Sequence, residues 1–100
     1  MNHNIVMKMF AALGQDSRLS IYQRVVQAGE AGLSAGKIGE HLAIAQTTLS
    51  FHLKELVHSG LLKSRQHGKF VIYTANPAAR QAVIAFLSGL DVATPSDNPV

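Results

Sequence analysis

The sequence contains no cysteine and no tryptophan, and only six of its 100 residues are aromatic. The absence of cysteine excludes disulfide bonds, thiolate metal ligands and thiol redox switching. No apolar run approaches the ~20 residues that a membrane-spanning helix needs. The first residues, interrupted by Lys8, lack the pattern of a signal peptide. We therefore expect a cytoplasmic protein without a membrane partner.

The hydrophobic content is high for so short a chain. A domain of this size buries less than ~70% of its unfolded surface, so its own core is limited. Yet 47% of the residues are hydrophobic, more than a small monomer easily hides. This mismatch favours a partner surface, most simply a second copy of the same chain.

The positive charge is concentrated in residues 46–70. This stretch has four basic residues and one acidic residue, for a net charge of +3. The rest of the chain has five basic and five acidic residues, so its net charge is zero. All of the formal net charge therefore lies in a quarter of the chain, a pattern typical of a nucleic-acid-binding surface.

Hydrophobic periodicity and capping signals predict five helices and one β-hairpin. Asp16 and Ser34 are the expected N-caps of the second and third helices, and Asn76 followed by Pro77 predicts the start of the last one. The helices are expected over residues 4–13, 17–28, 35–43, 46–59 and 77–90, and the strands over 61–66 and 70–74. Residues 1–91 are expected to form one domain, followed by a disordered tail over 92–100.

The helix over 46–59 has two different faces. Leu49, Leu53, Leu56 and Val57 recur at helical spacing and predict a buried stripe. A short turn joins this helix to the one before it, which is the helix-turn-helix pattern. With the basic hairpin that follows, the element order predicts a mainly α fold, a winged helix-turn-helix with a small β-hairpin wing.

Three motifs resemble the ArsR/SmtB family of small dimeric bacterial repressors. They are ALGQDSRLSIYQ, QTTLSFHLKELVHSGLL and RQHGKFVIY, in the family's order, and the resemblance covers roughly residues 8–88. It implies a homodimeric transcriptional repressor that binds double-stranded DNA at an inverted-repeat operator and is released by a signal.

DNA contacts are expected from the helix over 46–59 and from the hairpin wing. Polar side chains on such a helix can read base edges in the major groove, and basic residues of a wing can reach phosphates. The sequence departs from the family at Phe51, where histidine or arginine is common. The resemblance implies DNA contacts at Gln46, Thr48, Ser50, Phe51 and His52. The expected DNA-binding residues also include Thr47 and Lys54 on the same helix, and Lys63, Arg65, His67 and Lys69 on the wing.

The family resemblance also implies a dimer formed by the first and last helices. Both helices have more apolar residues than one protomer needs for its own core. The expected interface residues are Ile5, Met9, Phe10, Val83, Phe86, Leu87 and Leu90.

No enzymatic, cofactor or metal site is expected. The sequence contains no GxSxG, no HExxH and no glycine-rich phosphate loop. The five histidines are spread along the chain, and the positions of the family's usual metal sites lack the necessary ligands. The effector is left open: a small organic ligand, a histidine and carboxylate metal site between subunits, or none.

An alternative hypothesis is a winged-helix module that binds a protein through the same helix, without specific DNA binding. Lys54, Lys63, Arg65 and Lys69 argue against it, because such a module has no need to concentrate the whole net charge there.

Overall fold

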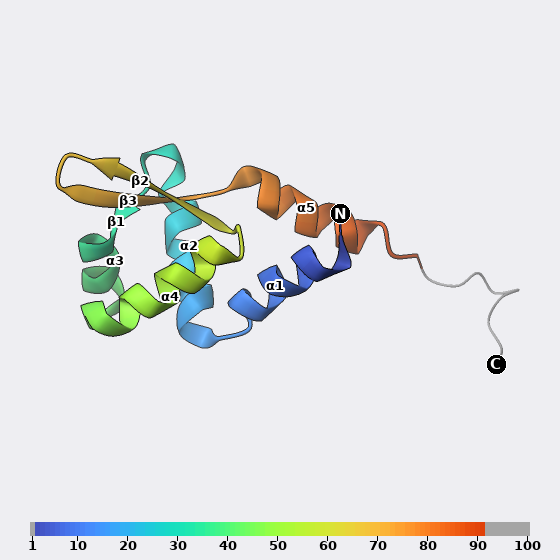
Figure 1. The fold of residues 1–100 in the computed structure, drawn as a ribbon, viewed down its shortest axis with the longest axis horizontal. Helices are drawn as coiled ribbons and strands as arrows, with labels where there is room; N and C mark the ends of the chain where they lie inside the picture. The colour runs from blue at the N-terminus through green and yellow to red at the C-terminus, as the bar shows by residue number, and fades with distance from the viewer. Residues whose placement is uncertain (1, 92–100) are drawn as a thin grey trace, which may run out of the picture.

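The computed structural model describes residues 2–91, so the tail expected over 92–100 lies outside the described residues. Within that range the five predicted helices and the hairpin are confirmed (Figure 1). The elements are α1 (His3–Leu13), α2 (Asp16–Gln27), a 3-10 turn η1 (Gly29–Ala31), β1 (Leu33–Ser34), α3 (Ala35–Leu42), α4 (Gln46–His58), β2 (Leu62–His67), β3 (Phe70–Ala75) and α5 (Pro77–Ser88).

The hairpin is part of a three-stranded antiparallel sheet of order β1-β3-β2. The sequence did not predict β1, because a two-residue strand is too short to show an alternating pattern. It pairs with β3 through Leu33 and Tyr73. The β2–β3 ladder ends at the pair His67 and Phe70, which leaves a two-residue turn. Gly68 begins this turn with φ +61°, a conformation that glycine adopts without steric cost.

The helix caps largely agree with the sequence. Ser34 Oγ accepts a hydrogen bond from the Lys37 amide at 3.2 Å, as expected of an N-cap. Asn76 Oδ1 likewise accepts one from the Ala78 amide at 3.2 Å. The prediction for Asp16 was wrong: the cap of α2 is Gln15, whose Oε1 accepts from the Arg18 amide at 2.8 Å. Its longer side chain occupies the capping position, so Asp16 becomes the first helical residue.

The core joins α4 to the helices around it. Leu49, Leu53 and Leu56 are buried, as the helical stripe predicted, and they belong to one cluster with Ile21 and Ile38. Each fully buried leucine contributes roughly 1.5–3 kcal/mol of transfer free energy. This cluster therefore fixes how α4 sits against α2 and α3.

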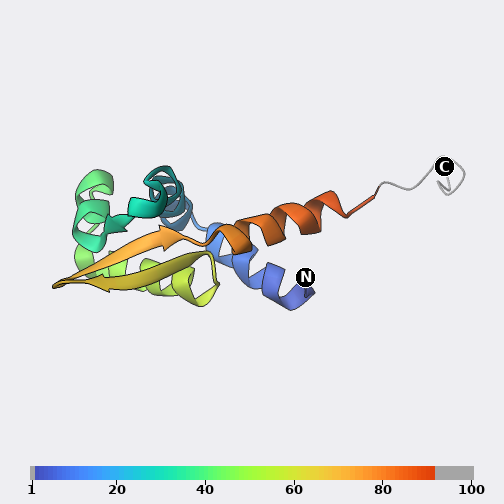
Figure 2. The ribbon, with the colours of Figure 1, turned by 90° about the horizontal axis from the view of Figure 1, so that it is seen from above.

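The molecule is elongated, with extents of 60 × 22 × 22 Å. Figures 1 and 2 place α3, α4 and the hairpin toward one end, while α1 and α5 lie side by side toward the other. Within residues 2–91 there is no helix of the length and apolar character that crossing a membrane would require. The hairpin tip and the start of α4 thus lie away from the two terminal helices, while the end of α4 lies beside α1.

Candidate nucleic-acid interface

One face of α4 is open to solvent and polar, apart from a single phenyl ring. Thr47, Ser50, Lys54 and His58 are exposed on it, as the helical spacing predicted. Phe51 lies among them and is 58% exposed. Hydroxyl and ammonium groups on an exposed helix are suited to base edges and phosphates.

His52 does not share this exposed face. It is only 8% exposed, and its Nδ1 lies 3.3 Å from Nη1 of Arg18 on α2. The structure therefore contradicts an exposed position for His52. The reason is helical spacing, because His52 lies three residues after Leu49 and four before Leu56, within the buried stripe. Its ring also meets the edge of the Phe51 ring, with centroids 5.7 Å apart.

Gln46 begins α4 and connects it to the preceding helix. Its Nε2 donates to the carbonyl oxygen of Ala35 at 3.3 Å. A Cβ atom at Gly39 would collide with the same amide nitrogen, so the two helices approach closely here. Gln46 is exposed, yet part of its hydrogen-bonding capacity already holds the helix-turn-helix together.

The hairpin presents different side chains on its two faces, because strand residues alternate. Arg65 points away from α4: its guanidinium donates to the carbonyl oxygens of Glu30, at 3.4 Å, and Ala31, at 3.2 Å. Arg65 thus anchors the wing to η1. By the same alternation Lys63 shares this outer face, while Ser64 lies on the side toward α4.

The tip of the hairpin is basic and exposed. His67 and Lys69 flank Gly68, and the side-chain Nε2 of Gln66 donates to the Gly68 carbonyl oxygen at 2.9 Å. The ammonium of Lys69 lies 6.0 Å from the centre of the Phe70 ring, the outer limit of a cation–π contact.

Lys54 on α4 and Lys69 at the hairpin tip have no ion-pair partners within residues 2–91. The one ion pair in that range joins Lys37 and Glu40 on α3 at 4.0 Å. Lys54 and Lys69 are therefore free to neutralise charge from outside the chain.

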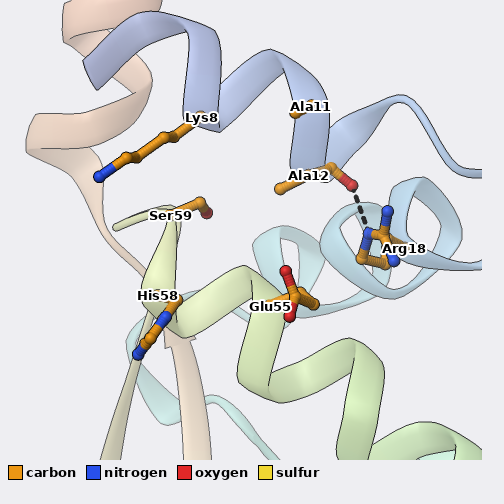
Figure 3. Close-up of a pocket in the computed structure, with 7 residues that line it drawn as sticks. All are labelled: Lys8, Ala11, Ala12, Arg18, Glu55, His58 and Ser59. Atoms are coloured by element: carbon orange, nitrogen blue, oxygen red, sulfur yellow. Dashed lines mark hydrogen bonds between the residues drawn. The ribbon is translucent and has the colours of Figure 1, made fainter. Parts of the chain in front are cut away.

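Glu55 is the single acidic residue within 46–70, and it lines a cavity beside α1. Glu55 lines a space of about 340 Å³ between α1, α2 and α4, together with Lys8 and Arg18 (Figure 3). Here Arg18 Nε donates to the Ala12 carbonyl oxygen at 2.8 Å. In Figure 3 the Glu55 side chain extends into this cavity, toward α1.

A second, smaller cavity of about 250 Å³ lies between α4 and the hairpin. We call it the notch. It is lined by Ser50, Leu53, Lys54, Val57, His58, Ser64 and Tyr73. The sequence reasoning missed Ser64 and Tyr73, although the alternation from buried Leu62 could have placed Ser64 on this face.

The terminal helices expose a large apolar surface. Of the expected interface residues, Ile5, Phe10, Leu87 and Leu90 are exposed, and Val83 and Phe86 are half-buried. Met9 does not fit that expectation, because it is only 4% exposed and belongs to the protomer's own core. Met7 and Ile84 are not among those expected interface residues, yet they are also exposed, at 52% and 48%.

Residues 2–91 contain no group of three side chains of the types that ligate metals placed to hold one ion. A shifted pKa occurs on α2, away from the exposed face of α4. Burial raises the pKa of the Tyr22 phenol on α2, and the charge of Arg80 opposes this in part. Among the described residues its buried hydroxyl has no hydrogen-bond partner.

Comparison with known proteins identifies the domain. Residues 13–65, more than half of the chain, match the model of a family described as a helix-turn-helix domain. The arsenic resistance transcriptional regulator ArsR1 of Pseudomonas putida is 30% identical over 82 residues, 82% of this chain and 62% of the relative. The chain belongs to the ArsR/SmtB family of winged helix-turn-helix proteins.

A further curated relative is YceK of Bacillus subtilis, an uncharacterized HTH-type transcriptional regulator. It is 37% identical over 62 residues, 62% of this chain and 61% of the relative. The matched part of the chain thus spans about three fifths of each curated relative's length.

Solved structures share the family's fold. An ArsR-like transcriptional regulator from Rhodococcus sp. RHA1 superposes with a TM-score of 0.76 at 26% identity, covering 86% of this chain and 78% of its own. The homodimeric winged helix-turn-helix domain of Mb0332 from Mycobacterium bovis gives a TM-score of 0.70 at 24% identity, covering 85% and 79%.

Proposed function

We propose that this protein is a DNA-binding transcriptional regulator, a repressor that acts as a homodimer in the cytoplasm on an inverted-repeat operator. The observation that carries the proposal is the exposed face of α4 beside a basic hairpin tip, in a segment that holds all of the net charge. Regulation by binding needs no catalytic group, so we assign the chain no enzymatic activity.

In this proposal α4 lies in a major groove, the docking geometry of helix-turn-helix proteins. Base edges are read by Thr47, Thr48, Ser50 and Phe51. Gln46 and His52 have another role, because their hydrogen bonds hold α4 against α3 and α2.

The wing is proposed to reach the DNA backbone with its tip. His67 and Lys69 project there, and Lys63 adds charge lower on the hairpin. Arg65 instead fixes the wing's orientation through the carbonyls of η1. The wing thus contributes mainly sequence-independent affinity.

The dimer is proposed to form through the apolar faces of α1 and α5. Exposed apolar side chains are concentrated on these two helices, and the similar Mb0332 domain is described as homodimeric. A two-fold axis between protomers predicts an inverted repeat, with half-sites about one helical turn apart or a multiple of that.

The alternative, a protein-interaction module, is favoured by one observation. Phe51 and Phe70 are 58% and 53% exposed, and exposed aromatic rings are common at protein interfaces. Binding to DNA distinguishes the two readings.

In a first step, we expect wild-type protein to select an inverted-repeat duplex from a random library. Its binding to that duplex is then measured by fluorescence anisotropy over a series of salt concentrations. Its affinity should fall steeply with salt because counterions are released. Lys69→Gln should weaken binding to all duplexes and lower the slope of log K against log salt by about 1.

Glu30→Gln is the matched control, since it changes one exposed charge away from the tip and should leave the salt slope within about 0.5 of the wild-type value. Failure of the wild-type protein to bind any duplex at low salt would contradict the proposed function.

A further inference from the structure

The notch between α4 and the hairpin is rich in hydrogen-bond donors. Ser50, Lys54 and His58 reach it from α4, and Ser64 and Tyr73 reach it from the two strands. Its base is apolar, formed by buried Leu53 and half-buried Val57. Its 250 Å³ is several times the ~30 Å³ that a water molecule occupies in the liquid.

The side chains of these donors are not used within the protein. Among the hydrogen bonds and ion pairs of residues 2–91, none involves the side chain of Ser50, Lys54, His58, Ser64 or Tyr73. No acidic side chain lines the notch, because Glu55 faces the cavity beside α1. Hydroxyl, ammonium and imidazole groups together form a site for an anion.

The position of the notch identifies that anion. In the proposed docking, α4 occupies a major groove and the wing tip reaches toward the adjacent minor groove. The sugar-phosphate strand that separates the two grooves must then pass between α4 and the hairpin, where the notch lies. We propose that the notch binds one phosphodiester of the DNA backbone in each half-site, with Lys54 as its charged contact and Ser64 as a hydroxyl donor.

This inference rests on the proposed function and deepens it. It gives Lys54 a backbone phosphate as its partner rather than a base. It also adds Ser64, His58 and Tyr73 to the contact surface. A phosphate held by both α4 and the wing would fix the angle between them on the duplex. The notch would then set the position of α4 in the major groove.

The experiment removes one phosphate charge at a time. Duplexes carrying the selected inverted repeat are prepared with a neutral methylphosphonate at one symmetric position per half-site, and the position is scanned along each strand. We expect one position to weaken wild-type binding about tenfold or more, as loss of a charged hydrogen bond does. At that position the same substitution should cost the Lys54→Gln variant less than about threefold, because the partner charge is already absent.

Lys8→Gln is the matched control. It removes the same charge from α1, beside the other cavity, and should retain the full methylphosphonate effect. Ser64→Ala should weaken binding about fivefold to every sequence, with no change in base preference.

Three outcomes overturn the inference. If wild-type protein binds the repeat but each methylphosphonate costs Lys54→Gln as much as wild type, the notch holds no phosphate. If a change at Ser64 alters base preference, the notch reads bases. If wild-type protein binds no duplex at all, the proposed function fails, and the phosphate site with it.

Discussion

At the scale of single residues, Phe51 is the most unusual feature of the exposed face of α4. Its ring is 58% exposed on a helix whose neighbouring side chains are polar, and its edge contact with His52 limits how it can turn. The apolar group available to such a ring in the major groove is the 5-methyl of thymine. We therefore expect Phe51 to favour thymine at one position of each half-site.

The prediction is tested by replacing single thymines of the selected duplex with uracil, which removes the methyl group alone. At one position the wild-type affinity should fall about fourfold, since a buried methyl(ene) group is worth ~0.8 kcal/mol. The Phe51→Ala variant should not distinguish thymine from uracil there. Equal sensitivity of the variant and the wild type at every position would contradict the assignment. Phe70→Ala, a change at an exposed ring of the wing, is the control.

Residue positions also show where sequence reasoning stopped. The exposed face of α4 could be predicted, because Leu49, Leu53 and Leu56 fix the orientation of the helix. His52 was assigned by family resemblance, although its spacing from the same leucines indicated burial. The bonds from Arg65 to η1 could not be predicted, since they join residues 34 and 35 positions apart whose approach depends on the whole fold.

At the scale of elements, α4 begins without a side-chain cap. Ala45 precedes it with φ −63° and ψ 143°, the extended geometry of an N-cap, but offers no oxygen to the free amides of the first turn. Ala45→Ser should therefore stabilise the fold by about 1 kcal/mol. In a domain of this size that corresponds to a rise in Tm of about 4–8 °C.

Thermal unfolding followed by circular dichroism measures this effect. Ala43→Ser is the matched control, because Ala43 ends α3 in the left-handed region and cannot cap α4. An unchanged Tm for Ala45→Ser, or an equal rise for Ala43→Ser, would show that the first turn of α4 is satisfied in another way.

Elements differed in how much the sequence could predict. The helices were predicted because each combines a periodic apolar stripe with a start or stop signal, as Asn76-Pro77 does for α5. The strand β1 was not predicted, since Leu33 and Ser34 form it only by pairing with β3. The notch could not be predicted either, because it depends on how the hairpin packs beside α4.

At the scale of the whole molecule, the proposed DNA-binding surface and the proposed dimer contact lie toward opposite ends. The hairpin and the start of α4 lie toward one end of a molecule 60 Å long, and helices α1 and α5 lie toward the other (Figures 1 and 2). Together with Leu90 just after α5, these two helices have most of the large exposed apolar residues within 2–91. Two copies joined by these helices would present two α4 helices and two wings to the DNA at a fixed spacing. The account therefore depends on a dimer, and Leu87 on α5, 51% exposed, is central to the proposed contact.

The most direct measurement of this claim is sedimentation of the protein, alone and with an inverted-repeat duplex. Wild-type protein should sediment as a dimer and bind with two protomers per duplex. Leu87→Glu should sediment as a monomer and lose about a hundredfold in affinity for the repeat, because an unpaired charge opposes burial of the interface. Leu19→Glu, a similar change at an exposed leucine of α2, should behave as wild type. A wild-type monomer, or a Leu87→Glu variant that binds the repeat as tightly as wild type, would contradict the account.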